Sequence, residues 1–287
     1  MVKIYDCFLF NNELDMLELH LSEMYDHVDY FIIGEANRSF KGEPKPYNLL
    51  DNWERFKPWA DKIRRIQIDS IPHPDPWVNE DLDREFLKHG LHDAEEWDII
   101  ICSDCDEILS STALGNMRKL TQYWYFALNV PQFYYRLNYL MTEWSTTDGY
   151  RVIWHTMGRA PRYKYLGEIN GMRKLKGHQN NDNEVTVWHA GWHFSFMGDE
   201  QFVYQKLKTF DYTWLGEFKA QTYDLDKCIQ ENRWIDNDAK FELARVNTYF
   251  PQTVINNRER WDKWIIQRDN LRDVRNILNP RLAPIND

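Results

Sequence analysis

The run from Trp97 to Leu109 limits the possible folds of this 287-residue chain more than any other stretch. It reads Trp-Asp-Ile-Ile-Ile-Cys-Ser-Asp-Cys-Asp-Glu-Ile-Leu, so the apolar segment from Ile99 to Cys102 ends abruptly in acid. A short apolar, β-branched run is typical of a strand that is buried on both faces of a sheet. Open α/β sheets form their ligand crevice at the carboxyl ends of the strands. The pattern therefore predicts an α/β sheet with carboxylates at its ligand-binding edge.

Asp104 and Asp106 are candidate metal ligands at that edge. Residues two apart in an extended chain point the same way, and paired carboxylate oxygens suit a divalent cation that can hold a diphosphate. The alternative is that this acidic segment begins a helix, with Asp106 or Ser110 as its N-cap. The same spacing recurs at three places that follow no apolar run, namely Asp81/Asp83, Asp224/Asp226 and Asp236/Asp238.

Composition narrows the function classes. The net charge of −10 argues against nucleic acid as the main partner. The 13 Trp and 16 Tyr suit stacking on sugars, although large aromatics are also ordinary core residues. No second cysteine pair or nearby histidine completes a zinc site with Cys102 and Cys105, so we expect buried free thiols and a reducing compartment. Without a signal peptide or membrane span in the sequence, the expected location is the cytoplasm.

The first half of the chain alternates strands and helices. Residues 2–10 predict a strand, Leu14 to Met24 a helix capped by Asn11 or Asn12, and residues 28–34 a second strand. This order predicts a right-handed crossover and a parallel sheet. Further elements are expected as a short helix at 52–59, a strand at 63–68, a helix from 81 to 89 whose Arg84 faces the crevice, and a helix at 112–120.

The second half is aromatic and mixed. We expect two strands between 123 and 140 separated by Pro131, strands at 151–155 and 184–190, and a helix after Gly198 capped by Asp199. A basic loop lies between them, with Arg159, Arg162, Lys164, Arg173, Lys174 and Lys176. The predicted organisation is one continuous domain at 1–222, with an α/β first half (1–110) and an aromatic, mixed second half (111–222), followed by a helical extension at 223–287 packed on it.

The acidic pair suits the transfer of a sugar from a nucleotide diphosphate. A divalent ion would stabilise the charge that develops on the leaving diphosphate. His193, or else His189, could supply a third ligand, and Mn²⁺ accepts such a mixed oxygen and imidazole set better than Mg²⁺ does. Either histidine could instead be an aromatic neighbour in a Trp-lined core.

Several motifs in order resemble glycosyltransferase family 17 over residues 2 to 215. They are Asp6-Cys7-Phe8, Phe10-Asn11-Asn12-Glu13-Leu14-Asp15, Tyr25-Asp26, Glu35-Ala36-Asn37-Arg38, Ser103-Asp104-Cys105-Asp106-Glu107-Ile108 and Gly191-Trp192-His193. The resemblance implies a GT-A-like α/β fold, a mixed sheet flanked by helices, and a divalent metal. It also implies inversion at the anomeric carbon and a UDP-sugar donor, which is UDP-GlcNAc in the animal members. The acceptor would be a glycan or glycoconjugate, with a surface polysaccharide or lipid-linked glycan at least as expected as an N-glycan.

The resemblance also suggests roles by position. Asp104 and Asp106 would hold the metal and the donor diphosphate. Phe10, Asn11 and Asn12 follow the first strand, where GT-A-like folds bind the nucleotide. The remaining donor-side candidates are Glu35, Arg38 and Arg84, although the first two could instead form a structural ion pair.

Inversion in one displacement requires a carboxylate near the acceptor hydroxyl. The candidates are Asp148, Glu168, Asp199 and Glu200, and we rank Glu168 and Glu200 together. Glu168 lies in a glycine-flanked loop, whereas Glu200 begins a helix, where the helix dipole favours an acid in any case.

Two other functions compete with sugar transfer. A phosphohydrolase of the haloacid-dehalogenase type also places an Asp-x-Asp pair after an apolar strand, but the further residues of that site are not obvious in this chain. A non-enzymatic carbohydrate-binding protein would explain the aromatic excess but not the acidic pair.

Overall fold

The computed structural model describes residues 2–143, 154–175, 182–209, 224–231, 239–269 and 271–278. The chain forms two compact units. Unit 1 contains Met1–Val130 and Thr156–Gly191, and unit 2 contains Pro131–His155 and Trp192–Asp287. The candidate base Asp148 and the start of the strand expected at 151–155 lie outside the described residues.

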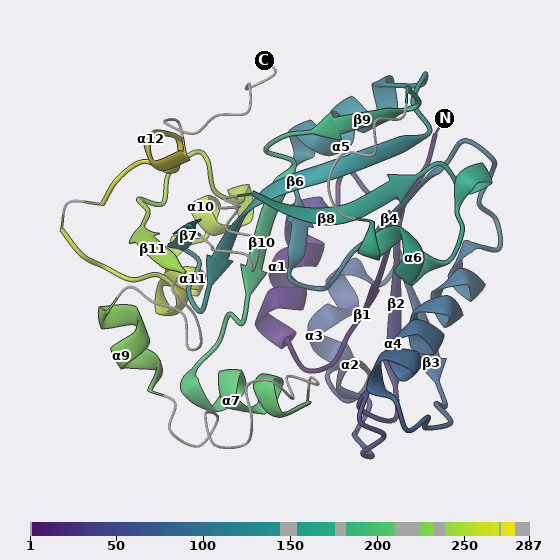
Figure 1. Ribbon diagram of the computed structural model, residues 1–287, viewed down its shortest axis with the longest axis horizontal. Coiled ribbons are helices and arrows are strands. Elements are labelled where there is room, and N and C mark those ends of the chain that lie inside the picture. The colour runs from purple at the N-terminus through teal and green to yellow at the C-terminus, as the bar shows by residue number, and fades with distance from the viewer. Residues whose placement is uncertain are drawn as a thin grey trace. The chain divides into compact units, whose positions relative to one another are not determined.

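Unit 1 is built around a parallel sheet of four strands in the order β3-β2-β1-β4 (Figure 1). The predicted parallel sheet is therefore confirmed, and all four residues of the central apolar run are buried in it. The strands are β1 (Ile4–Leu9), β2 (Tyr30–Ala36), β3 (Ile63–Ile68) and β4 (Ile99–Cys102).

Helices cover both faces of this sheet. Side chains alternate along β1, so that Tyr5 and Cys7 pack with Leu87 and Leu91 of the 3₁₀ helix η2 (Phe86–Leu91). On the other face, the ring of Phe8 lies 4.6 Å from that of His20 in α1 (Leu14–Met24). The sheet is buried on both sides, which explains why its strands are apolar throughout.

Two helix starts differ from the sequence-based expectation. Neither Asn11 nor Asn12 caps α1; the N-cap is Glu13, whose carboxylate instead accepts the backbone N–H groups of both asparagines. The helix expected from residue 81 begins earlier, as α4 (Pro76–Glu85), because Asp75 caps it and proline is well tolerated in a first turn. The helix expected at 52–59 is three short pieces, α2 (Asn48–Asp51), α3 (Trp53–Phe56) and η1 (Lys57–Trp59).

The acidic segment leads into a second strand before the next helix. It continues as β5 (Glu107–Leu109), and α5 (Ser111–Lys119) follows. The cap of α5 is Ser110, whose Oγ accepts the N–H of Ala113 at 3.2 Å. Because Ser110 fills this role, Asp104 and Asp106 are not needed to begin the helix.

Pro131 does not divide the aromatic stretch into two strands. A single strand, β6 (Tyr125–Tyr134), runs through it. Residues Tyr125 to Leu128 pair with β9 (Glu184–Val187), and Gln132 to Tyr134 pair with β10 (Gly191–Ser195). Pro131 lies between the residues of β6 that pair with β9 and those that pair with β10, and a proline is tolerated in a strand where its missing N–H has no partner to bond.

The rest of unit 1 follows β6 in the chain. The strand expected at 151–155 is described as β8 (Trp154–Pro161), which ends later than predicted. Part of the expected basic loop is helical, with η3 (Tyr163–Tyr165) followed by α6 (Ile169–Lys174).

Unit 2 combines short helices with strands. The Gly-Trp-His motif lies within β10 rather than after a strand. Its region beyond residue 223 is not wholly helical, because β11 (Lys240–Leu243) pairs antiparallel with β7 (Tyr139–Glu143), and the ring of Phe241 stacks on that of Tyr139 at 4.6 Å. Its helices are α7 (Glu200–Thr209), α9 (Leu225–Gln230), α10 (Gln252–Asn256), α11 (Arg258–Trp261), η4 (Asp262–Trp264) and α12 (Val274–Leu278).

The architecture is thus mixed α/β, with parallel and mixed sheets flanked by helices. The four cysteines are buried free thiols, as expected. In the described part of the chain, no helix combines the length and apolar character needed to cross a membrane.

Candidate functional site

The carboxyl ends of β1, β2 and β4 bring most of the predicted donor-side residues to one edge of the unit 1 sheet. The N–H of Ser103, directly after β4, donates to the carbonyl of Cys7 in β1 at 3.1 Å. The N–H of Phe10, directly after β1, donates to the carbonyl of Gly34 in β2 at 2.8 Å. The loops that carry Asn11 and Asp104 therefore leave neighbouring strands at the same edge, where open α/β sheets bind ligands.

The Asp104–Asp106 segment is a turn and not an extended chain. The N–H of Glu107 donates to the carbonyl of Asp104 at 3.0 Å, and the Glu107 carboxylate accepts the N–H of Asp104 at 2.8 Å. The expectation that extended geometry points both aspartates the same way is therefore wrong. Asp106 is buried, whereas 26% of the Asp104 side chain is exposed.

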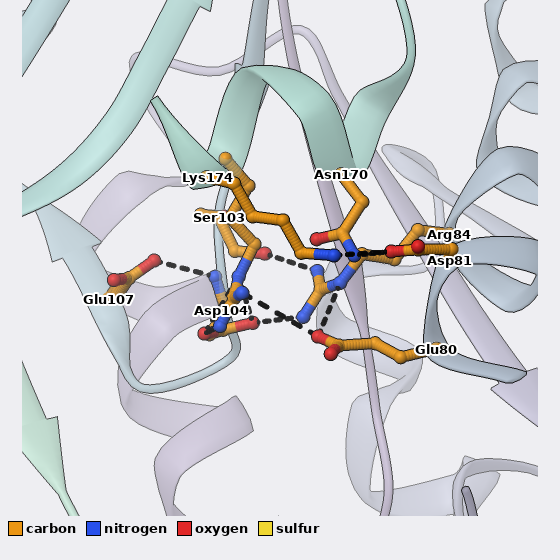
Figure 2. Close-up of polar contacts among 9 residues, drawn as sticks. Glu80, Asp81, Arg84, Ser103, Asp104, Glu107, Asn170 and Lys174 are labelled. Carbon is orange, nitrogen blue, oxygen red and sulfur yellow. Dashed lines mark hydrogen bonds and ion pairs between the residues drawn. The ribbon is translucent and has the colours of Figure 1, made fainter. Parts of the chain in front are cut away.

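Asp104 lies between two arginines. Nη2 of Arg84 donates to Oδ1 of Asp104 at 2.5 Å, and Nε of Arg173 lies 3.0 and 3.1 Å from the two carboxylate oxygens. Nη2 of Arg173 also donates to Oδ2. Figure 2 shows Asp104 and Arg84 in this cluster, together with Glu80, whose carboxylate accepts from Nε of Arg84 at 3.0 Å. The sequence-based placement of Arg84 near the acidic turn thus holds, while its role stays a prediction.

These contacts fix the charge states of the cluster. Burial raises the pKa of Asp104, but the guanidinium groups of Arg173 and Arg84 outweigh it and hold that pKa well below its usual range. Burial lowers the pKa of Arg173, and the neighbouring Asp104 carboxylate outweighs it, so that the pKa of Arg173 is raised. Asp104 is therefore an ionised carboxylate that already has cationic partners.

The helix that carries Arg173 is held against α4. Asp81 of α4 accepts from Asn170 and, at 2.7 Å, from the ammonium of Lys174 (Figure 2). The carboxylate of Glu85 accepts the N–H of Ile169 at 2.6 Å, at the first residue of α6. These bonds fix the backbone of α6 from outside the cluster.

Gly158 in β8 fixes the same helix from the other side. Its φ is +111°, a conformation that favours glycine, and a Cβ at this position would lie 2.6 Å from the carbonyl oxygen of Arg173. The strand can approach Arg173 closely only because residue 158 has no side chain.

A second network lies inside the sheet, behind the acidic turn. Asp6 in β1 accepts from Oγ of Ser103 at 2.8 Å through one oxygen and contacts Nε2 of His20 at 2.6 Å through the other. Nδ1 of His20 lies 2.9 Å from the carbonyl of Cys105 and must donate, because a carbonyl can only accept. Asp6, His20 and Ser103 are fully buried. The network thus fixes the position of the turn through two hydrogen bonds, one to the side chain of Ser103 and one to the backbone carbonyl of Cys105 between the two aspartates.

The other donor-side candidates hold the loops at the same edge. Glu35 lies in β2, not after it, and its buried carboxylate accepts the N–H of Leu49 at 2.9 Å. Burial raises the pKa of Glu35 despite this bond. Arg38 does not pair with Glu35; its guanidinium donates to the carbonyl of Gly42 at 3.0 Å. The structure therefore gives both residues loop contacts in place of the ion pair that we considered.

The loop after β1 is likewise fixed. The carbonyl of Asn11 accepts from the side chain of Asn48 at 2.7 Å, and Asn12 is exposed while Phe10 is buried. Asn12 thus offers a side chain at this edge, whereas Phe10 shapes the core beneath it.

The histidine candidates are in different parts of the chain. His193 is buried in β10 of unit 2, where its ring lies 4.3 Å from that of His155. His189 follows β9 in unit 1 and adopts a φ of +53°. The ring contact of His193 agrees with a core aromatic, and its metal role stays a prediction.

The two candidate bases differ in their surroundings. Glu168 is exposed and is the N-cap residue of α6, but its side chain caps nothing. Over the ranges that the structure describes, its carboxylate makes no hydrogen bond or ion pair. Glu200 is exposed in the first turn of α7 in unit 2, after Asp199, which accepts the N–H of Phe202 at 2.8 Å.

The charge of the acidic turn suits a divalent cation. The turn and α4 bring together the carboxylates of Glu80, Asp104 and Glu107, and the guanidinium groups of Arg84 and Arg173 oppose them. The formal charge of these five groups is therefore −1, and Asp106 lies buried two residues after Asp104. Carboxylate oxygens are the ligands that Mg²⁺ and Mn²⁺ prefer, so the donor set fits such an ion, provided that Asp104 exchanges an arginine for it.

Comparison with known proteins identifies the class. The family model of Glycosyltransferase family 17 matches residues 1–235. The chain therefore belongs to this family, and its class is that of a glycosyltransferase. The resemblance carried by the acidic turn and the Gly-Trp-His motif is confirmed.

Particular relatives match a shorter stretch. The chain is 32% identical over 108 residues to the human β-1,4-mannosyl-glycoprotein 4-β-N-acetylglucosaminyltransferase, and 31% identical over 108 residues to the mouse enzyme of that name. Each alignment covers 34% of this chain and 20% of the relative.

Sequence reasoning missed three members of the site. His20 was read only as part of an apolar helix, Glu80 was not considered, and Arg173 was one of many basic residues in an expected loop. A signal was present for His20, because it lies three residues after Leu17 on the helix face that packs on β1. Nothing in the sequence joins Arg173 to a turn 69 residues away.

Proposed function

We propose that this chain is a metal-dependent, inverting glycosyltransferase that transfers GlcNAc from UDP-GlcNAc to a hydroxyl of a glycan or glycoconjugate. The observation that carries the proposal is the acidic turn with a net negative cluster at the carboxyl edge of the sheet, in a chain of glycosyltransferase family 17. The relatives' name supports GlcNAc as the sugar.

Asp104 and Asp106 would hold Mn²⁺, or Mg²⁺, at this edge. The ion would act as a Lewis acid that stabilises charge on the departing diphosphate. The buried network of Asp6, His20 and Ser103 supports this role, because it fixes the backbone of the turn before any ligand binds. A preorganised charged site loses little energy to rearrangement during the reaction.

The nucleotide would lie over the neighbouring loops. Asn11 and Asn12 would contact it at the end of β1, while Glu35 and Arg38 hold the loop after β2 in shape. Arg84 would face the diphosphate from α4. Its ion pair with Glu80 keeps the guanidinium at the cluster when Asp104 is occupied elsewhere.

Glu168 is the better first candidate for the base. A general base requires a carboxylate that is available to the acceptor hydroxyl, and that of Glu168 is exposed and begins the helix that carries Arg173. Glu200 remains the second candidate. Glu168→Gln should lower kcat with little change in UDP binding, whereas the same result for Glu200→Gln alone would assign the base to unit 2.

The first test is calorimetric titration with UDP and UDP-GlcNAc, with and without Mn²⁺. We expect binding that depends on the metal and is lost in Asp106→Asn. Glu23→Gln is a matched control outside the cluster and should bind as the wild type does. Turnover of UDP-GlcNAc with candidate glycan acceptors would then identify the acceptor.

If the calorimetric test fails, the two alternative functions have to be considered again. No binding of any uridine nucleotide under either condition would reject the proposed donor. Hydrolysis of a simple phosphoester would then favour the phosphohydrolase, and glycan binding indifferent to metal and UDP would favour a carbohydrate-binding protein.

A further inference from the structure

Arg173 and Arg84 bind the same carboxylate but differ in how firmly they are held. Only 4% of the Arg84 side chain is exposed, and besides Asp104 it contacts Glu80 at 3.0 Å and the carbonyl of Ser103 at 3.2 Å. Arg173 is 22% exposed, and among the residues that the structure describes its guanidinium has one ionic partner besides Asp104, namely Glu80 at 3.5 Å. If Asp104 leaves, Arg84 keeps two close contacts and Arg173 keeps one long contact.

We propose that Arg173 is an exchangeable counter-ion that neutralises Asp104 in the absence of ligand and donates to the donor's diphosphate once Asp104 binds the metal. The inference rests on the proposed function, because it needs a metal at Asp104 and a diphosphate beside it. It assigns a ligand class, an anionic diphosphate, to a residue in the stretch where the sequence indicated only a basic loop.

Charge balance supports the exchange. A metal ion held by the Asp104 carboxylate would compete with the guanidinium of Arg173, which contacts both oxygens of that carboxylate. The displaced cation would then lie beside a metal-bound diphosphate, whose oxygens suit the planar donors of arginine. Arg173 would then have an anionic partner in both states.

The backbone of Arg173 is held while its side chain is partly exposed. Asp81 and Glu85 bind α6 at Asn170, Lys174 and Ile169, and Gly158 contacts the Arg173 backbone. The exchange therefore requires only side-chain rotation. If Arg173 only stabilised the fold, we would expect its guanidinium to stay bound to Asp104 when ligands bind.

The test separates two affinities that should change in opposite directions. In Arg173→Gln, Asp104 loses a competing cation, so Mn²⁺ alone should bind about five- to tenfold more tightly. The same variant lacks a charge-assisted donor, so inorganic pyrophosphate and UDP, each in saturating Mn²⁺, should bind about tenfold more weakly. Both are measured by calorimetry on the full chain, with the folded state checked by circular dichroism.

Two further variants sharpen the result. Lys174→Gln changes the adjacent cation of the same helix, which pairs with Asp81 outside the cluster, and should leave both affinities unchanged. Arg173→Lys keeps the charge but not the planar fork, so its pyrophosphate affinity should lie between those of wild type and Arg173→Gln.

Other outcomes would overturn the proposal. If Arg173→Gln tightens Mn²⁺ without weakening pyrophosphate, Arg173 is only a counter-ion; if it weakens both, Arg173 positions Asp104. These results leave wild-type binding of UDP intact and so spare the proposed function. If the wild type binds neither diphosphate with Mn²⁺, both proposals fail; if it binds pyrophosphate but not UDP, only the uridine donor is wrong.

Discussion

Two aspartates of unit 1 act on the same turn from opposite directions. Asp6 reaches it from within the sheet, fully buried, with Ser103 and His20 as partners. Asp104 lies on the turn itself, partly exposed, with Arg84 and Arg173 as partners. Both carboxylates have close partners, yet only Asp104 has a partly exposed one, Arg173, which solvent or a ligand can reach.

This difference in burial indicates that the Asp6 network and the Asp104 cluster have different roles. A buried pair is costly to break, because the remaining polar groups have no water to replace the lost partner. A partly exposed ion pair, such as that of Asp104 and Arg173, can exchange one partner for another at little cost. We infer that the inner network sets the position of the turn and that the outer cluster performs binding, and the predictions below test that division.

The largest expected effect is on transfer. Asp104→Asn should lower kcat about 1000-fold, which raises the activation free energy by about 4 kcal/mol, because a neutral amide cannot replace the negative charge that would hold the metal. Steady-state assays with UDP-GlcNAc would measure this, and the thermal unfolding midpoint should change by only a few degrees. Wild-type kcat in Asp104→Asn or in Asp106→Asn would show that the metal assignment is wrong.

Breaking the inner network should affect stability more than any outer substitution. Asp6→Asn replaces the buried carboxylate that contacts both His20 and Ser103 and should lower the free energy of unfolding by about 3 kcal/mol. Urea unfolding would measure it, with the exposed Asp26→Asn as a control that should change stability by less than about 0.5 kcal/mol. Equal stability of the two variants would remove the structural role of Asp6.

Gly158→Ala should disturb both regions moderately. The added Cβ meets the carbonyl of Arg173 in a strained backbone conformation, which should cost about 2 kcal/mol of stability. Pyrophosphate binding should weaken at the same time, because α6 must shift. Gly115→Ala, where a Cβ has open space, is the matched control. A stable variant with weakened binding would place Gly158 in the site alone.

The smallest effect concerns acid stability. Arg173 and Arg84 outweigh burial and lower the pKa of Asp104, so this carboxylate contributes stability above its unfolded-state pKa of about 4, and the contribution declines as the pH falls from about 5 toward the folded-state pKa. Urea unfolding between pH 3 and 7 should show a shallower acid decline in Asp104→Asn, by about 1 kcal/mol. Parallel curves for the two proteins would contradict the proposed ion pairs.

Local patterns predicted the sheet because its strands are continuous apolar runs. The strand at 63–68 was predicted with its observed bounds, and the apolar run ending in acid identified β4 and the acidic segment after it, although that segment is a turn and not extended. The prediction that Pro131 separates two strands was wrong. A proline disrupts a strand only where the ladder needs a backbone N–H, and strand pairing is decided by the tertiary structure.

The site was predicted only where chemistry and position coincide in the sequence. Asp104 and Asp106 were predicted because they follow a buried strand. Arg84 was predicted because it lies on the helix that precedes this strand in the chain. The contact between Arg173 and Asp104 joins residues 69 apart in the chain, and the hydrogen bond from His20 to the carbonyl of Cys105 joins residues 85 apart. No periodicity or spacing records such contacts.

The amino-acid sequence by itself determined the parallel sheet, the acidic segment at its carboxyl edge and the family, because apolar strands and the order of motifs can be read along the chain. The tertiary structure alone decided which aspartate is locked inside and which is open to exchange. It also decided why Gly191 is a glycine, since a Cβ there would lie 1.9 Å from the carbonyl oxygen of Ile108. Burial and close approach are properties of packed surfaces, and they exist only once distant segments meet.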